Sequence, residues 1–200
     1  LMDLSSINKV YFIGIGGIGM SALANYFIQK NIQVYGYDRE ASMITENLTN
    51  LGSNIIYNFN DFNVDEFKSD IENTLVIYTP AISKQHPLLI KFKENEFNIF
   101  KRAEVLQKIS ENSKCIAIAG THGKTTTSAI LAHILKVSDL KFSAFVGGIM
   151  VNYNSNFLYN GEDYIIVEAD EFDRSFLKLN PSYACITSLD SDHLDIYEDS

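Results

Sequence analysis

Residues 120–126, Gly-Thr-His-Gly-Lys-Thr-Thr, have the types and the order of a phosphate-binding loop. Backbone N–H groups of a glycine-rich turn can point at phosphate oxygens, and the ammonium of Lys124 can add a positive charge beside them. The hydroxyl of Thr125 can hold Mg2+. The common spacing G-x-x-x-x-G-K-[ST] is not kept, because the glycine that precedes Gly123 is Gly120. The stretch therefore predicts ATP binding by a loop of unusual spacing.

The elements expected on either side of this loop support the interpretation. Ile116–Ala119 is an apolar run typical of a buried strand. After the lysine, apolar residues recur at helical spacing, namely Ala129, Ile130, Ala132, Ile134 and Val137. The alternative is that Gly-Lys-Thr falls here by chance, and the order strand, turn, helix weighs against it.

Another glycine loop, the first in the chain, lies near the N-terminus and fits G-x-G-x-x-G, so the loop at 120–126 is the second. Its glycines permit a tight turn and a close approach of the backbone to a diphosphate at the start of the next helix. Asp38 ends the next expected strand, Gln33–Tyr37, where it can accept a hydrogen bond from a ribose hydroxyl. The alternative is a glycine turn needed only for packing of helix on sheet. The candidate binding residues of the loop are Gly14, Gly16, Gly17, Ile18 and Gly19.

Acidic residues follow the expected strand 164–167, at the sheet edge where strand carboxyl ends face ligands. Because Mg2+ prefers oxygen ligands and bridges phosphates, one or two carboxylates beside Thr125 suffice to hold it. Glu168 fits this role best, since it directly ends the apolar run. Asp170 is a further acid of the cluster. An acidic, solvated turn fits Glu171 and Asp173 better.

A third cluster, Asp190-Ser-Asp-His-Leu-Asp195, follows the expected strand 183–187. His193 is flanked by acids, so it is a candidate metal ligand or acid–base group. The alternative is a histidine in a polar loop with neither role. His86, beside Pro87, and His133, within the helix after the second loop, are expected to be structural.

Composition agrees with a globular enzyme, since 46% of the 200 residues are hydrophobic. The net charge of -9 argues against nucleic acid as the main partner. Cys115 and Cys185 fall in expected strands and are expected to be buried and apolar, not a disulfide or metal pair. The apolar stretch 10–28 is interrupted by four glycines, which argues against a membrane span. No export signal is recognisable, so we expect a cytoplasmic protein without membrane insertion.

The chain alternates strand and helix patterns, which predicts an α/β fold with parallel sheets and right-handed crossovers. The expected strands are 10–15, 33–37, 53–57, 74–78, 98–100, 116–119, 142–145, 164–168 and 183–187. A helical segment, 102–109, and a polar stretch lead to the second glycine-loop strand, so the boundary is expected there. The prediction is a Rossmann-like domain over residues 1–108, followed by an incomplete P-loop-type ATPase domain over 109–200.

Taken together, the motifs resemble those of the Mur ligases, ATP-dependent amide-forming enzymes of peptidoglycan precursor synthesis. The similarity extends over essentially all 200 residues. The matching segments are residues 14–21, 102–104, 120–126, 168–171 and 192–195. The shortened loop that is anomalous for a general P-loop is the one that this family carries.

The resemblance implies that the first glycine loop binds the UDP of a sugar substrate, not NAD, and that the second binds ATP. It implies that Lys124 contacts ATP phosphates, that Thr125 and Glu168 bind one Mg2+, and that His193 binds a second. Lys124, Glu168 and His193 would be the catalytic residues. The other implied sites are the ATP loop, Gly120, Thr121, His122, Gly123, Lys124, Thr125 and Thr126, and the uridine contacts Asp38, Thr79, Pro80 and Ala81. No role follows for Arg102.

The expected substrates are UDP-N-acetylmuramate and L-alanine, joined through an acyl phosphate. Because this family has a third domain, the chain is expected to be an N-terminal fragment that is inactive alone. The alternatives are a ligase that recycles murein peptides, a non-catalytic module that binds UDP-sugar, and an NAD-dependent oxidoreductase. The oligomeric state stays open.

Overall fold

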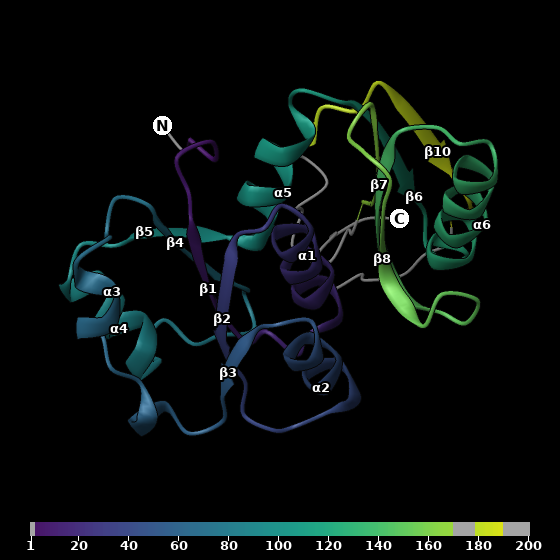
Figure 1. The fold of residues 1–200 in the computed structure, drawn as a ribbon. Coiled ribbons are helices and arrows are strands. Elements are labelled where there is room, and N and C mark those ends of the chain that lie inside the picture. The colour runs from purple at the N-terminus through teal and green to yellow at the C-terminus, as the bar shows by residue number, and fades with distance from the viewer. Residues whose placement is uncertain (1–2, 170–178, 190–200) are drawn as a thin grey trace. The chain divides into compact units, whose positions relative to one another are not determined.

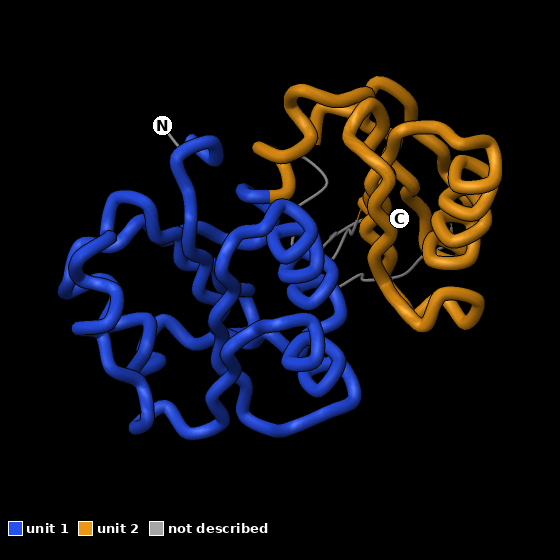
Figure 2. Tube along the Cα trace, in the orientation of Figure 1, with its two compact units in different colours: residues 1–105 blue, residues 106–200 orange. Residues whose placement is uncertain are grey.

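The computed structural model describes residues 3–169 and 179–189, and these form two compact units, drawn in different colours in Figure 2. The division lies between Val105 and Leu106. This division and the boundary expected from the sequence, after residue 108, both fall within helix α5 (Arg102–Ser110). Each unit carries one of the two glycine loops.

The first unit is built on a five-stranded parallel sheet with the strand order β3-β2-β1-β4-β5 (Figure 1). The strands are β1 (Lys9–Ile13), β2 (Gln33–Tyr37), β3 (Asn54–Ile56), β4 (Thr74–Tyr78) and β5 (Asn98–Lys101). The helices are α1 (Ile18–Gln29), α2 (Met43–Asn50), α3 (Asp65–Lys68) and α4 (Pro87–Glu94), with a 3-10 turn, η1 (Phe59–Asp61). The α/β class and the parallel sheet expected from the sequence are confirmed.

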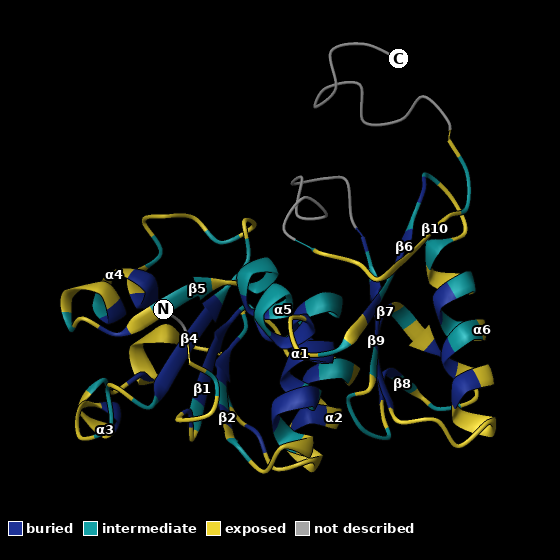
Figure 3. Ribbon diagram, turned by 90° about the horizontal axis from the view of Figure 1, so that it is seen from above, coloured by how far each residue is buried: buried dark blue, intermediate teal, exposed yellow. Residues whose placement is uncertain are grey.

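The central strand β1 is apolar along most of its length because both faces of the sheet are covered. On one face Phe12 packs edge-on against Phe27 of α1, with ring centroids 6.2 Å apart. On the other face the ring centroid of Tyr11 lies 4.9 Å from that of Phe92 of α4. The buried strands between exposed helix surfaces are visible in Figure 3. This sandwich holds the carboxyl ends of β1, β2 and β4 at one edge, where the first glycine loop lies.

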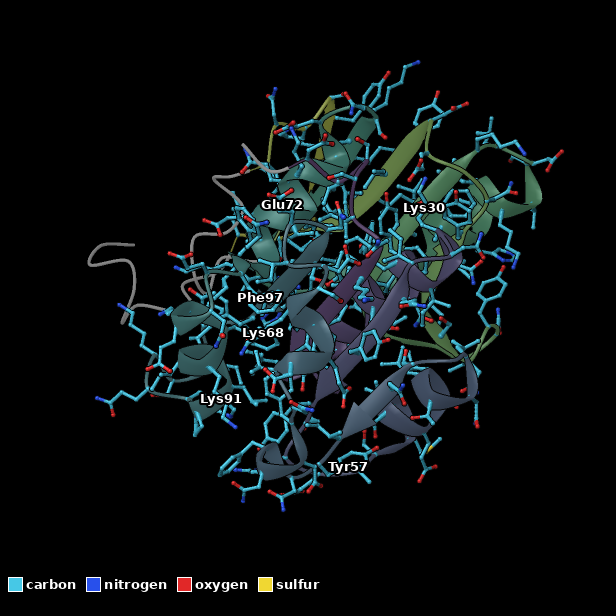
Figure 4. The ribbon with its side chains drawn as sticks, turned by 60° about the vertical axis from the view of Figure 1, so that its left-hand side comes forward. Lys30, Tyr57, Lys68, Glu72, Lys91 and Phe97 are labelled. Atoms are coloured by element: carbon cyan, nitrogen blue, oxygen red, sulfur yellow. The ribbon has the colours of Figure 1, made fainter. Side chains whose placement is uncertain are left out.

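The α3–α4 side of the first unit carries both lysines and aromatic residues, and Figure 4 labels Lys68, Lys91 and Phe97. Lys68 of α3 is exposed, whereas Phe97, just before β5, is buried. Lys91 of α4 keeps its ammonium 5.8 Å from the ring centroid of Phe62. Lys91 thus lies beside the aromatic layer within cation–π distance of Phe62.

The second unit contains a sheet with the order β10-β6-β9-β7-β8 and the helix α6 (Lys124–Val137). Its strands are β6 (Lys114–Ala119), β7 (Phe142–Met150), β8 (Ser155–Tyr159), β9 (Tyr164–Glu168) and β10 (Tyr183–Ile186). All described pairs are parallel except β7 with β8. Ala132 and Leu135 of α6 pack in the same core as Phe142 and Ile166 of the sheet.

Two expectations for this unit are corrected. β7 continues to Met150, five residues beyond the expected end at Phe145, and forms an antiparallel hairpin with β8, which the sequence did not predict. Cys115 is buried, but Cys185 is exposed, because β10 is at the sheet edge and all four of its residues are exposed.

None of the helices within residues 3–169 and 179–189 is long and apolar enough to cross a membrane. The stretch 10–28 is divided between β1, a glycine turn and α1.

Candidate functional site

The turn between β6 and α6 is shaped by two glycines with positive φ. Gly120 has φ +124° and Gly123, the N-cap of α6, has φ +84°. Side chains rarely adopt these angles, so glycine is required at both positions. No side chain caps the helix, and its first backbone N–H groups have no partner within the helix. This end of α6 therefore offers donors and a partial positive charge to an anion.

Lys124, the first residue of α6, folds its side chain back over the turn. Its ammonium donates a hydrogen bond to the Gly120 carbonyl, with a distance of 2.5 Å. The positive charge of Lys124 thus lies at the turn itself and not in open solvent.

Thr125 and Glu168 meet although they are 43 residues apart in the sequence. The Thr125 hydroxyl donates to Glu168 Oε2 at 3.0 Å. Glu168 ends β9, which is the neighbour of β6 in the sheet, so the strand ends bring both groups to one edge. The other carboxylate oxygen, Oε1, accepts a hydrogen bond from the backbone N–H of Gly147 at 2.7 Å. Glu168 is therefore held from both sides.

The donor set at this edge fits a magnesium ion. A hydroxyl and a carboxylate are hard oxygen ligands, and Mg2+ commonly takes one or two carboxylates and completes its shell with phosphates and water. Within the part of the chain that the structure describes, no group of three or more acidic, histidine or cysteine side chains is gathered for a metal. His193, Asp170, Glu171, Asp173 and the other acids of 190–195 lie outside the described residues.

Two residues that the sequence analysis did not single out lie against the same turn. Thr187 and Ser188 follow β10, the other neighbour of β6. The His122 N–H donates to Ser188 Oγ at 2.8 Å, and the Thr121 N–H donates to the Ser188 carbonyl at 3.2 Å. No local signal marks these residues, because their role depends on contacts with a turn that is more than 60 residues away in the sequence.

The first glycine loop connects β1 to α1. Gly14 has φ +87°, and the Gly17 N–H donates to the Gly14 carbonyl at 3.3 Å, which closes the turn. Asp38 lies against this loop: its Oδ2 accepts from the Gly16 N–H at 2.7 Å, and its Oδ1 accepts from the Arg39 N–H at 2.8 Å. Each carboxylate oxygen has a second lone pair, so Asp38 can bind the loop and still accept from a ligand.

Arg102, to which the sequence analysis gave no role, lies over the start of α1. A Cβ atom added to Gly19 would overlap Nη1 of the Arg102 guanidinium and come 2.9 Å from its Cζ. Gly19 thus leaves room for a positive charge beside the first turn of α1. The sequence analysis noted residues 102–104 as one of the segments that match the family but gave Arg102 no role, because Arg102, the first residue of α5, follows the loop by more than 80 residues.

The segment Thr79-Pro80-Ala81 follows β4 and forms a turn of its own. The Ala81 N–H donates to Thr79 Oγ1 at 3.2 Å, and the Ile82 N–H donates to the Thr79 carbonyl at 3.0 Å. Ile82 reaches the glycine loop, since its Cδ1 lies 3.3 Å from the position of a Cβ on Gly14. The segment is therefore next to the loop through Ile82.

His86 and His133 make local contacts. Nδ1 of His86 accepts from the Leu88 N–H at 3.3 Å and caps α4, and burial lowers the pKa of this imidazole. Nδ1 of His133 lies 2.6 Å from the Tyr153 hydroxyl, which joins α6 to the β7–β8 turn.

Comparison with known proteins identifies the family. The model of the Mur ligase family catalytic domain matches residues 9–114, and that of the Mur ligase middle domain matches residues 118–200. The chain belongs to the Mur ligase family. Curated relatives of the chain include the UDP-N-acetylmuramate–L-alanine ligases of Flavobacterium psychrophilum, 55% identical, and Flavobacterium johnsoniae, 54% identical. These alignments cover 99% and 98% of this chain. The chain spans 44% and 43% of the length of these two relatives.

Solved Mur ligase structures share this fold. The UDP-N-acetylmuramate–alanine ligase of Thermotoga maritima has a TM-score of 0.78 and 32% identity, over 96% of this chain and 44% of that one. The UDP-N-acetylmuramate:L-alanyl-gamma-D-glutamyl-meso-diaminopimelate ligase of Neisseria meningitides has a TM-score of 0.83 over 96% of this chain and 64% of that one. Its identity of 24% shows a common fold alone.

Proposed function

We propose that this chain supplies the nucleotide-binding parts of an ATP-dependent ligase that joins L-alanine to the carboxylate of UDP-N-acetylmuramate, a step of peptidoglycan precursor synthesis. Relatives that are 54–55% identical over nearly the whole chain carry this name, which supports the proposal. Because the chain spans 44% of such a relative, the activity is proposed for a protein of the relatives' full length, and the chain alone is expected to be inactive. We assign residues 1–108 to the UDP-sugar domain and 109–200 to the ATP domain.

The hydrogen bond between Thr125 Oγ1 and Glu168 Oε2 is the observation that carries the proposal. It joins the helix that starts with Lys124 to the end of the adjacent strand, at a distance of 3.0 Å. A cation, a hydroxyl and a carboxylate at one helix N-terminus form the minimal set of groups that can hold a nucleoside triphosphate with its metal.

In this proposal the ATP loop comprises residues 120–126. Lys124 would release the Gly120 carbonyl and contact the phosphates, while the first N–H groups of α6 donate to them. Thr125 and Glu168 would hold Mg2+, which neutralises charge on the phosphoryl oxygens when bound. A second metal ligand, His193, is retained as a proposal from the family resemblance.

The residues of the site act mainly by positioning and by charge. The carboxylate of the muramate attacks the γ-phosphorus of ATP, so a carboxylate–phosphoryl bond forms, the bond to the leaving oxygen breaks, and ADP departs. The amine of L-alanine then attacks the acyl carbon, and phosphate leaves as the amide forms. Lys124 stabilises the negative charge that develops on the transferred group. No protein nucleophile is needed.

The first glycine loop would bind the diphosphate of UDP-N-acetylmuramate. Gly14, Gly16, Gly17, Ile18 and Gly19 form the turn before α1, whose N-terminus favours anions. Asp38, Thr79, Pro80 and Ala81 are proposed to contact the uridine. Arg102 adds a cation beside Gly19 and is proposed as a further diphosphate contact. We expect the protein to act in the cytoplasm, where ATP is available.

A murein-peptide recycling ligase is the nearest alternative, because such an enzyme shares this fold. The identity of 32–55% to alanine ligases, against 24% to the Neisseria structure, favours L-alanine. An NAD-dependent oxidoreductase would leave the second loop and Glu168 without a role. A non-catalytic UDP-sugar module would bind substrate without turnover at full length.

Two measurements test the proposal. Titration calorimetry of this chain with UDP-N-acetylmuramate is expected to give binding, and NAD is the control ligand. Binding of NAD alone would contradict the proposal. With a protein of the relatives' full length, ATP consumption should require L-alanine, and dependence on L-alanyl-γ-D-glutamyl-diaminopimelate instead would favour the recycling ligase.

A further inference from the structure

The segment that follows β10 makes a dense set of hydrogen bonds with the ATP loop. The Thr187 N–H donates to the Ala119 carbonyl at 2.9 Å, which continues the parallel pairing of β10 with β6 by one residue. The Thr187 hydroxyl then lies between two carbonyls, 3.1 Å from that of Ala119 and 2.5 Å from that of His122. Its single proton is shared between them, so the hydroxyl holds both ends of the turn.

Ser188 binds the same turn through its backbone and its side chain. Its carbonyl accepts from the Thr121 N–H at 3.2 Å, and its Oγ accepts from the His122 N–H at 2.8 Å. The Ser188 hydroxyl also lies 3.4 Å from the His122 carbonyl. Both backbone polar groups of His122 are therefore engaged by Thr187 and Ser188. The N–H groups of Thr121 and His122 both donate to Ser188. The N–H groups of the loop that can donate to a phosphate are therefore those nearer α6.

This contact also explains the glycine at position 120. A Cβ atom on Gly120 would lie 2.8 Å from the backbone N and O of Ser188 and would overlap the Thr187 hydroxyl. Real Cβ atoms do not approach backbone atoms so closely, and φ of +124° excludes side chains independently. Gly120, the glycine whose spacing departs from the common phosphate loop, is thus required by close approach of the 187–188 backbone.

We propose that Thr187 and Ser188 are positioning residues that hold residues 119–122 of the ATP loop in the shape that binds phosphate. The inference rests on the proposed function, since it presupposes that the loop binds ATP. A loop that is ordered before the ligand arrives loses less conformational entropy on binding, which raises affinity without any contact to the ligand. Neither residue needs to touch ATP.

The test combines hydrogen exchange with nucleotide affinity, both on the full chain. Ser188→Ala removes one oxygen atom, and Thr187→Val replaces the hydroxyl by a methyl group of similar size. Thr187→Ser, which keeps the hydroxyl, is the matched control. Exchange of the His122 amide without nucleotide is expected to speed up about fivefold in Ser188→Ala, as for loss of one hydrogen bond. The dissociation constant of a fluorescent ATP analogue with Mg2+ should rise about fivefold in both disruptive variants.

Affinity for UDP-N-acetylmuramate is the second readout, because it involves the other glycine loop and should not change. Unchanged ATP affinity in Ser188→Ala, with ATP binding by the wild type, would overturn the inference even if exchange became faster, since the contact would then be structural alone. Failure of the wild-type chain to bind ATP would overturn the inference together with the assignment of residues 120–126 as an ATP loop. If Thr187→Val does not fold, Ser188→Ala still decides the question.

Discussion

The backbone N–H of Gly147 donates to Glu168 Oε1 at 2.7 Å, and the glutamate side chain fills the space where a side chain of residue 147 would stand. A Cβ atom on Gly147 would lie 2.5 Å from Glu168 Oε2. The next residue, Gly148, lies against Thr125, because a Cβ atom on Gly148 would come 3.0 Å from Cγ2 of Thr125. Strand β7 thus forms one wall around the Thr125–Glu168 pair.

We expect Gly147→Ala to displace the Glu168 carboxylate and to weaken metal binding. Loss of a contact that orients a metal ligand commonly costs about tenfold or more in affinity. The measurement is titration of the chain with Mn2+, a spectroscopically visible substitute for Mg2+, in the presence of ATP. Exposed Ile149→Ala, on the same strand, is the matched control and should bind Mn2+ like the wild type.

A double mutant separates this effect from misfolding. Glu168→Asp shortens the side chain by one methylene and relieves the clash, so Gly147→Ala should cost little further affinity in that background. If Gly147→Ala lowers Mn2+ affinity by the same factor in the wild type and in Glu168→Asp, Gly147 does not act through Glu168.

Removal of the Lys124 charge is expected to abolish most of the activity. In a protein of the relatives' full length, Lys124→Ala should lower kcat by about 10²- to 10³-fold, the cost typical of removing one preorganised group that stabilises transition-state charge. Release of phosphate from ATP is the measurement. Lys108→Ala provides the control, since its ion pair with Glu111 lies at the surface and contributes little. If Lys124→Ala turns over like the wild type, Lys124 does not stabilise the charge on the transferred phosphoryl group.

Part of strand β7 could not be predicted because its glycines oppose the strand pattern. Apolar residues predict a strand from Phe142 to Phe145, and Gly147-Gly148 then weaken the signal. The structure continues the strand through a register shift between Phe145 and Met150. Gly147 and Gly148 leave room for the side chains of Glu168 and Thr125. The rule that glycine weakens a strand therefore fails at the candidate site, where such failures are expected.

The hairpin partner β8 and the contacts of Ser188 were missed for a different reason. β8 offers three adjacent apolar residues, Phe157-Leu158-Tyr159, after a buried Asn156, which is too short a pattern to identify a strand. Ser188 meets the loop across 66 residues of sequence, and no local pattern encodes such a pairing. By contrast, the sequence did predict that Thr125 and Glu168 are close, because both follow parallel strands whose carboxyl ends share one edge.

Asp38 is expected to support UDP-sugar binding through the glycine loop. Asp38→Ala removes the carboxylate that accepts from the Gly16 N–H and so leaves the turn less ordered. Hydrogen bonds to a charged group contribute about 2 kcal/mol, so affinity for UDP-N-acetylmuramate should fall by at least about tenfold. Calorimetry on the chain measures this loss. Asp61→Ala, an exposed acid of η1, is the control, and equal affinities in the two variants would contradict the prediction.

The N-cap of α4 predicts a pH-dependent stability. Nδ1 of His86 accepts from the Leu88 N–H, which requires an unprotonated Nδ1, and burial lowers the pKa of the ring below its ordinary value of 6.5. Between the lowered folded pKa and 6.5 the unfolded chain binds more protons than the folded one. The contribution of His86 is therefore fully present above pH 6.5 and is lost as the pH falls through the folded pKa.

His86→Asn should remove this pH dependence while keeping the cap, because asparagine is a favoured N-cap that does not titrate. The free energy of unfolding, measured by denaturant titration at several pH values from about 8 to 5, should fall more steeply in the wild type than in the variant. The remaining histidines are the same in both proteins, so the difference isolates His86. His86→Ala, which lacks the cap, should be less stable by about 1 kcal/mol above pH 7. Parallel curves for the wild type and His86→Asn would mean that protonation of His86 does not break the cap.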